Sequence, residues 1–128
     1  MHIYNLYKGF EVELFTGNYN SHVGVSSLIE ESFPDFVKEP DNRNIEYITP
    51  PSQNYEILYK SLLEPRKNLR YWLKEKDLTI IPSSTLCFKH DPQFQRSDLT
   101  NNYHTFIESS YGLSIATSSV HINLGIED

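Results

Sequence analysis

The sequence predicts one α+β domain in which the apolar face of a sheet packs against helices. Three segments, 9–16, 43–49 and 119–124, alternate between apolar and polar side chains, as strands with one buried face do. Residues 52–77 instead carry leucines at helical spacing. The 128 residues are enough for a single domain with a core, and no internal repeat or low-complexity segment divides them.

The strand over residues 9–16 carries the most informative pattern. Its apolar side chains share one face: Phe10, Val12 and Leu14. Glu11 and Glu13 lie on the other face, roughly 6–7 Å apart by strand geometry. Like charges at that separation repel unless water, a cation or a proton lies between them. The pair therefore indicates either a shared Mg²⁺ ion or the solvated face of an amphipathic strand.

Short elements separate this strand from the next one. We expect a helix capped by Ser26 or Ser27 that ends before Pro34, and then a strand over residues 36–38. A turn at 39–42 leads into the strand over 43–49, which the two prolines at 50–51 terminate because neither can donate to a ladder.

The segment over residues 52–77 is predicted to be a long helix with Ser52 as its N-terminal cap. Pro65 predicts either a kink or a division into two helices. One stripe is apolar: Leu58, Leu62, Leu69 and Leu73. The second half is cationic and is interpreted as a solvated face: Arg66, Lys67, Arg70, Lys74 and Lys76.

The last third of the chain alternates apolar runs with polar stretches. Strands are predicted over residues 78–82 and over the apolar run that ends at 88, followed by a loop over 89–100. Residues 101–111 look helical, with Tyr103, Phe106 and Ile107 facing inward. Residues 113–118 fit neither pattern, and the strand over 119–124 follows.

Three strands in one sheet, with apolar faces on the helices, would share a concave polar surface. That surface carries three carboxylates and an imidazole: Glu11, Glu13, Glu46 and His121. This donor set suits a hard divalent cation with room for phosphate oxygens. In the alternative interpretation, Arg43 and the helix cations neutralise the acids and no metal is needed. His104 is a secondary candidate for contact with a substrate.

Composition excludes several classes of protein. A net charge of −6 and a pI near 5.3 argue against nucleic acids and anionic membranes as partners. No apolar run approaches transmembrane length, and the single Cys87 excludes an internal disulfide, so a cytoplasmic protein is predicted. Phosphate-binding glycine loops and the common zinc-protease and serine-hydrolase motifs are absent from the sequence.

Several segments in order resemble glutamate–cysteine ligase of the cyanobacterial type. They are residues 9–13, 39–51, 62–66, 103–104, 111–112 and 119–125, which together span nearly the whole chain. The resemblance implies a glutamine-synthetase-like carboxylate–amine ligase fold, whose antiparallel half-barrel sheet has helices on one face and holds ATP and Mg²⁺ on the concave face. The implied reaction phosphorylates the γ-carboxylate of glutamate with ATP. The amine of cysteine then displaces phosphate to give γ-glutamylcysteine, the first step of glutathione biosynthesis.

The resemblance also assigns roles to residues. Glu11, Glu13, Glu46 and His121 become the Mg²⁺ ligands, the three glutamates being the catalytic carboxylates. Arg43, Arg96 and Asn123 become the residues that contact ATP or a substrate carboxylate.

Enzymes of this family are several times longer than this chain. The resemblance therefore implies that residues 1–128 are the N-terminal part of a catalytic domain, with little activity alone. An open sheet edge would favour self-association or a C-terminal partner chain. Two alternatives are a non-catalytic, partner-binding remnant and a small hydrolase with paired carboxylates, which would need neither ATP nor metal.

Overall fold

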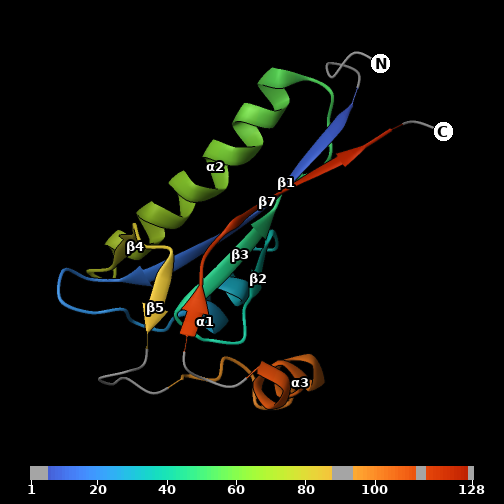
Figure 1. Ribbon diagram of the computed structural model, residues 1–128. Helices are drawn as coiled ribbons and strands as arrows, with labels where there is room; N and C mark the ends of the chain where they lie inside the picture. The colour runs from blue at the N-terminus through green and yellow to red at the C-terminus, as the bar shows by residue number, and fades with distance from the viewer. Residues whose placement is uncertain (1–5, 88–93, 112–114, 127–128) are drawn as a thin grey trace.

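The computed structural model describes residues 6–87, 94–111 and 115–126, and these form an α+β arrangement (Figure 1). The predicted fold class is confirmed: a mainly antiparallel five-stranded sheet is accompanied by three helices in the described part of the chain. The elements in chain order are β1 (Tyr7–Gly17), α1 (Ser26–Ser32), β2 (Phe36–Lys38), β3 (Asn44–Ile48), α2 (Tyr55–Lys74), β4 (Thr79–Ile81), β5 (Thr85–Cys87), α3 (Asn102–Tyr111), β6 (Ile115–Thr117) and β7 (Val120–Gly125).

Strand β1 is the centre of the sheet, and every strand of that sheet except β2 pairs with it directly. β3 runs antiparallel along one edge of β1, and β2 pairs with the far edge of β3. The other edge of β1 is shared, because β7 pairs with residues 7–12 and β4 with residues 15–17. Strands β5 and β6 form a separate two-stranded sheet. Strands from both ends of the chain therefore meet along β1.

The core lies on one face of the sheet, between the strands and helices α1 and α2. Val12 and Leu14 of β1 and Ile45 of β3 point into it, as the alternating patterns predicted. Helix α1 contributes Ile29, and α2 contributes the buried leucines of its predicted stripe. Because side chains alternate along a strand, the acidic residues of β1 and β3 lie on the opposite face.

Helix α2 is a single helix that continues through Pro65, so the alternative of two helices is wrong. Its N-terminal cap is Asn54 instead of Ser52: Asn54 Oδ1 accepts hydrogen bonds from the backbone N–H groups of Glu56 (2.9 Å) and Ile57 (3.1 Å). Asp77, with φ of 55°, ends the helix in a left-handed conformation. The cap was therefore predicted two residues too early.

Two further expectations about the helices are wrong. Neither Ser26 nor Ser27 caps α1; Val25 precedes the helix without a side-chain cap, and the Ser26 hydroxyl instead donates to Asn42 Oδ1 at 2.7 Å. In α3, Tyr103 and Phe106 are exposed, whereas His104 is buried. Helix α3 packs near the sheet through a polar face, which its apolar spacing did not indicate.

Strand β7 has the predicted alternation, but its apolar side chains are exposed instead of packed against a helix. Val120, Ile122 and Leu124 lie on the same side of the sheet as the core, yet each is more than half exposed. They border the edge of β1 that α1 does not reach, and Figure 1 shows β7 extending away from the body of the sheet. In the part of the chain that the structure describes, no helix is long and apolar enough to cross a membrane.

Candidate functional site

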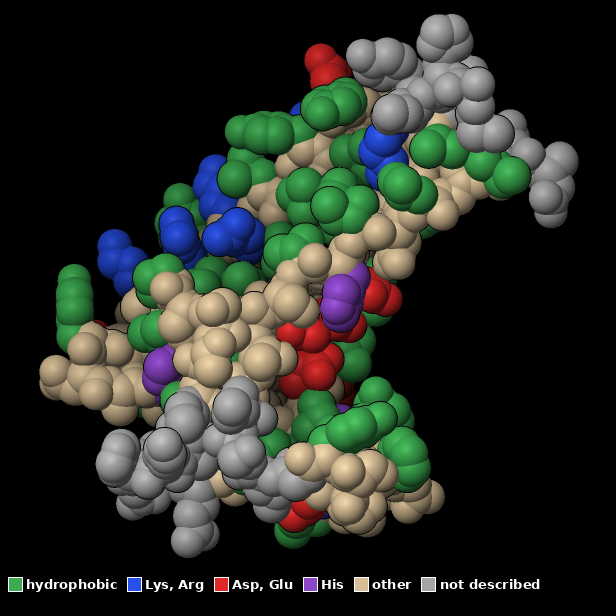
Figure 2. Space-filling model, in the orientation of Figure 1, with side chains coloured by type: hydrophobic (Ala, Val, Ile, Leu, Met, Phe, Trp, Pro, Cys, Tyr) green, Lys and Arg blue, Asp and Glu red, His purple; other side chains and the backbone are tan. Residues whose placement is uncertain are grey.

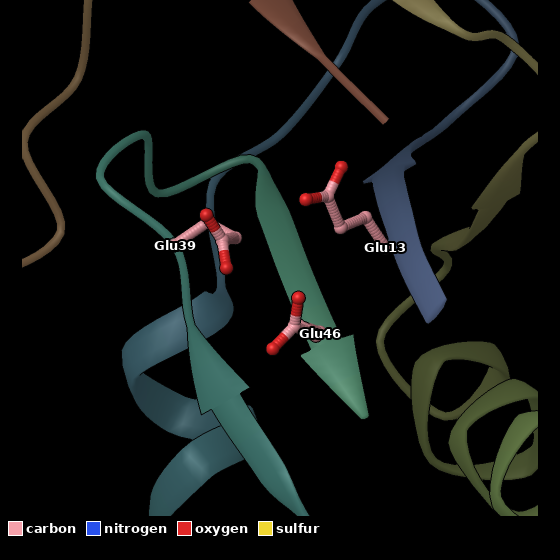
Figure 3. A group of neighbouring side chains, drawn as sticks. All are labelled: Glu13, Glu39 and Glu46. Atoms are coloured by element: carbon pink, nitrogen blue, oxygen red, sulfur yellow. The ribbon is translucent and has the colours of Figure 1, made fainter. Parts of the chain in front are cut away.

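Three carboxylates converge on the face of the sheet opposite the core (Figure 3). Glu13 of β1 lies directly opposite Glu46 of β3 in the antiparallel register, so their side chains share this face. Glu39 follows β2 by one residue and reaches the same space from the neighbouring strand. One carboxylate oxygen from each residue lies within 4.8 Å of the other two.

These carboxylates form one wall of a cleft of about 540 Å³. Glu11 and His121 extend this wall, while Asn101, Tyr103 and His104 from the start of α3 line the cleft as well. Figure 2 shows acidic side chains gathered in the hollow between the sheet and α3. The cleft is therefore open to solvent on one side and strongly negative within.

Burial and mutual repulsion raise the proton affinity of two of these acids. Burial is the main cause that raises the pKa of Glu39 to about 7, and the charges of Glu46, Glu13 and Glu11 raise it further. Burial also raises the pKa of Glu46, with Glu11 and Glu13 adding to the effect and His121 opposing it. The cluster thus lacks a compensating positive charge in its ion-free form.

Strand β7 supports the outer carboxylates. His121 is paired with Glu11 across the strands, and its Nδ1 lies 3.3 Å from Glu11 Oε2. The N–H of Ser119 donates to Glu13 Oε2 at 2.8 Å, and the Ser119 hydroxyl reaches the same oxygen at 3.1 Å. These contacts fix one oxygen of Glu13 and leave its second oxygen facing the cluster.

No lysine or arginine of the described residues forms an ion pair with the three clustered glutamates or with Glu11. Lys38 is the one lysine or arginine among the described residues of the cleft wall, and its ammonium group lies between Glu30 (3.3 Å) and Asp98 (3.4 Å). The alternative interpretation, in which Arg43 and the helix cations neutralise the cluster, therefore finds no direct contact in this structure.

Arg43 is fully buried, and its guanidinium binds Asp41 through two hydrogen bonds of 2.8 and 2.7 Å. Asp41 in turn accepts the backbone N–H of Gln95 at 3.1 Å. The Arg43–Asp41 pair thus links the turn before β3 to the segment before α3. Arg43 does not contact the clustered carboxylates. A contact between Arg43 and phosphate stays a prediction without support from its position.

Arg96 and Asn123 also lie apart from the three converging carboxylates. The Arg96 guanidinium contacts Glu108 and Thr105 of α3 and the backbone oxygen of Asp98. Asn123 pairs with Gly9 on β1, on the same face as Glu11 but in a neighbouring groove. Their proposed role in cofactor binding stays a prediction.

Glu39 is the member of the cluster that sequence reasoning missed. It stands before Pro40 in a segment interpreted as a turn, where no strand alternation marks its side chain. The sequence held one indication: Val37 of the short strand stands two positions before Glu39, and side chains two positions apart in a strand share a face. Val37 pairs with Glu46 across β2 and β3, so a residue two positions later points to the same face.

A larger cavity lies elsewhere, along α2, with a volume of about 830 Å³. Its walls are leucines, tyrosines and cationic side chains of α2, together with Leu78 and Thr79. Among the described residues that line it there is no carboxylate and no cluster of metal-binding donors. Chemistry therefore points to the smaller acidic cleft as the candidate site.

Comparison with known proteins identifies a family for this chain. Residues 7–128 match the family model described as Glutamate-cysteine ligase family 2, or GCS2. No curated protein matches the sequence. The match spans nearly the whole chain. This protein belongs to glutamate-cysteine ligase family 2.

Proposed function

We propose that this chain contributes to an ATP-dependent ligation that joins the γ-carboxylate of glutamate to the amine of cysteine. Ligases of its family use ATP and Mg²⁺. The observation that carries the proposal is the convergence of Glu13, Glu39 and Glu46 within 4.8 Å, where no lysine or arginine of the described residues forms an ion pair with them. In this proposal the reaction passes through a γ-glutamyl phosphate and yields γ-glutamylcysteine.

The donor set fits Mg²⁺. Its oxygens are hard ligands. Burial, and after it the charges of the neighbouring glutamates, raises the pKa of Glu39, so an ionised Glu39 is unfavourable there without a cation. Glu13, Glu39 and Glu46 would hold the ion, and Glu11 with His121 would complete a second pair of donors beside it. When bound, Mg²⁺ neutralises phosphate charge and orients the phosphoryl group for transfer.

The protein residues then have separate tasks. Ser119 holds one Glu13 oxygen in place by two hydrogen bonds, which leaves the carboxylate preorganised for a ligand. The β1–β3 register keeps Glu13 and Glu46 opposite one another without any induced movement. The cleft between the sheet and α3 supplies room for a phosphorylated substrate.

Calorimetric titration of the purified chain with Mg²⁺, and then with a non-hydrolysable ATP analogue, tests the proposal. We expect Mg²⁺ binding and Mg²⁺-dependent binding of the nucleotide. Glu46→Gln and Glu11→Gln should weaken both on the order of tenfold or more, because each removes a charged ligand. Glu31→Gln is the matched control, since Glu31 is exposed on α1, away from the cleft.

A folded chain that binds neither Mg²⁺ nor nucleotide would contradict the proposed site and favour a non-catalytic remnant. Activity without ATP or metal would instead favour a hydrolase with paired carboxylates. Equal weakening by Glu31→Gln and Glu46→Gln would show that general charge, and not the cluster, attracts the ion.

A further inference from the structure

His104 is the buried polar side chain of the cleft that the proposed metal site does not use. It lies in the first turn of α3, is only 3% exposed and lines the cleft across from the carboxylates. Asn101 fixes this turn, because its Oδ1 accepts the backbone N–H of Tyr103 (2.9 Å) and of His104 (3.2 Å). The backbone that carries the imidazole is therefore fixed by the Asn101 side chain.

The hydrogen bonds of Ser97 determine which nitrogen of His104 carries the proton. The Ser97 hydroxyl donates to the backbone oxygen of Glu39, and the same Oγ lies 3.3 Å from His104 Nδ1. A hydroxyl has one hydrogen, and a carbonyl oxygen can only accept. Ser97 Oγ must therefore accept from His104, which places the proton of the neutral ring on Nδ1.

The second ring nitrogen, Nε2, is consequently an acceptor. Within residues 6–87, 94–111 and 115–126, the hydrogen bond of the His104 ring is made through Nδ1, and none is made through Nε2. Burial lowers the pKa of His104, the charges of Arg96 and Lys38 lower it further, and Asp98 and Glu30 oppose them. The ring is thus neutral at pH 7, with a lone pair on Nε2 that has no partner in the described chain.

The cleft selects for a positively charged ligand group. Its lining contains six carboxylates and one lysine, the carboxylates being Glu11, Glu13, Glu30, Glu39, Glu46 and Asp98. Such a field concentrates cations and repels anions that arrive without a metal ion. A primary ammonium group is a cation, which the negative cleft favours, and it donates hydrogen bonds, which the Nε2 acceptor requires.

We infer that His104 is a specificity residue whose Nε2 accepts a hydrogen bond from the amine of the acceptor amino acid. This inference rests on the proposed function and adds to it the residue that orients the second substrate. Ser97 is a positioning residue that acts through His104, because it holds the ring in the Nδ1–H form. The same hydroxyl donates to the backbone oxygen of Glu39, so Ser97 contacts both His104 and a member of the carboxylate cluster.

Nuclear magnetic resonance of the full chain with ¹⁵N-labelled histidine tests the inference. Long-range ¹H–¹⁵N spectra at pH 7 should show His104 as the neutral Nδ1–H form. Cysteine, added with Mg²⁺, should shift the Nε2 resonance saturably. The matched probe is 3-mercaptopropionate, which lacks only the amine, and its binding should be at least about tenfold weaker.

Two substitutions separate substrate contact from structural support. His104→Gln keeps an acceptor near the position of Nε2, whereas His104→Asn keeps a polar group near Nδ1 and loses the distal acceptor. We expect His104→Gln to retain more cysteine binding, followed through the amide resonances of α3. A purely structural role predicts the reverse order, because only the asparagine can preserve the contact with Ser97.

An Nε2–H form of His104 would overturn the inference, as would equal responses to cysteine and 3-mercaptopropionate. Both the ring form and the two ligand responses are measured on the unsubstituted chain, so they remain valid even if a variant fails to fold. Mg²⁺ titration of the same sample keeps the two proposals apart: loss of metal binding contradicts the proposed metal site, while the His104 spectra still decide the amine contact.

Discussion

Glu39 combines a partly buried carboxylate with three acidic neighbours, and no lysine or arginine of the described residues forms an ion pair with it. Its position depends on the turn that brings residues 39–44 back alongside β2. The Arg43–Asp41 pair holds that turn from within, and Ser97, in the segment before α3, holds the Glu39 backbone. Contacts outside regular secondary structure thus determine the position of Glu39.

The raised pKa of Glu39 predicts how stability depends on pH in the absence of metal. The folded chain binds this proton more tightly than the unfolded chain, whose reference pKa is 4.5. The resulting stabilisation is present below pH 4.5 and is lost as pH rises through about 7. Glu39→Gln should abolish this loss and exceed the unsubstituted chain in stability by about 2 kcal/mol at pH 8.

Urea unfolding at intervals from pH 5 to pH 8 measures this effect. Glu31→Gln, on the exposed side of α1, should keep the pH dependence of the unsubstituted chain. Mg²⁺ should restore stability at pH 8 only where Glu39 is present. A constant difference between Glu39→Gln and the original chain at every pH would contradict the assignment.

At the scale of elements, α2 shows how packing overrides a local signal. Proline removes one backbone hydrogen bond from a helix interior, yet Pro65 is spanned by a continuous helix. Leu58 precedes Pro65 in the helix, and Leu69 and Leu73 follow it. All three leucines are buried. Burial on both sides of the proline holds the two halves in one element.

The N-terminus of α2 gives a second prediction. Asn54→Ala should lower the free energy of unfolding by about 1 kcal/mol, because two backbone N–H groups lose their acceptor. Asn54→Asp should retain most of the stability. Ser52→Ala serves as the comparison, since the Ser52 hydroxyl oxygen accepts the N–H of Asn54, which precedes the helix. Thermal unfolding followed by circular dichroism measures each; a larger loss from Ser52→Ala would make Ser52 the cap after all.

At the scale of the whole molecule, the sheet has one well-covered region and one exposed region. Val12 and Val120 pair directly across β1 and β7, on the same face, but they are 3% and 55% exposed. The difference arises because the helices cover β1 and leave β7 beyond their reach. Identical residues in register therefore sit in different environments.

This pair yields a matched test of the layered arrangement. Val12→Ala should cost about 2 kcal/mol, because it leaves a cavity in the core. Val120→Ala should change stability by less than about 0.5 kcal/mol. Denaturant titration of both variants under identical conditions compares them. Similar costs at the two positions would mean that β7 is covered in solution.

Most strands of the sheet and the long helix could be predicted from periodicity. The spacing of apolar residues within an element records which of its faces is buried. The shared face of Glu11, Glu13, Glu46 and His121 was predictable for the same reason, although their role as ligands stays a prediction. The caps of α1 and α2 were mistaken, since several neighbouring polar residues could each have served. The inward face of α3 was mistaken because polar contacts, and not apolar ones, hold it.

The α+β class, the strands with their two faces and the family of the chain all follow from the amino-acid sequence. Three features emerge only from the fold: Glu39 joins the cluster, Arg43 is buried against Asp41, and His104 lines the same cleft. The physical reason is that periodicity records which side of an element is buried. Distances among residues 13, 39, 46 and 104 instead depend on strand register and on how the intervening loops close.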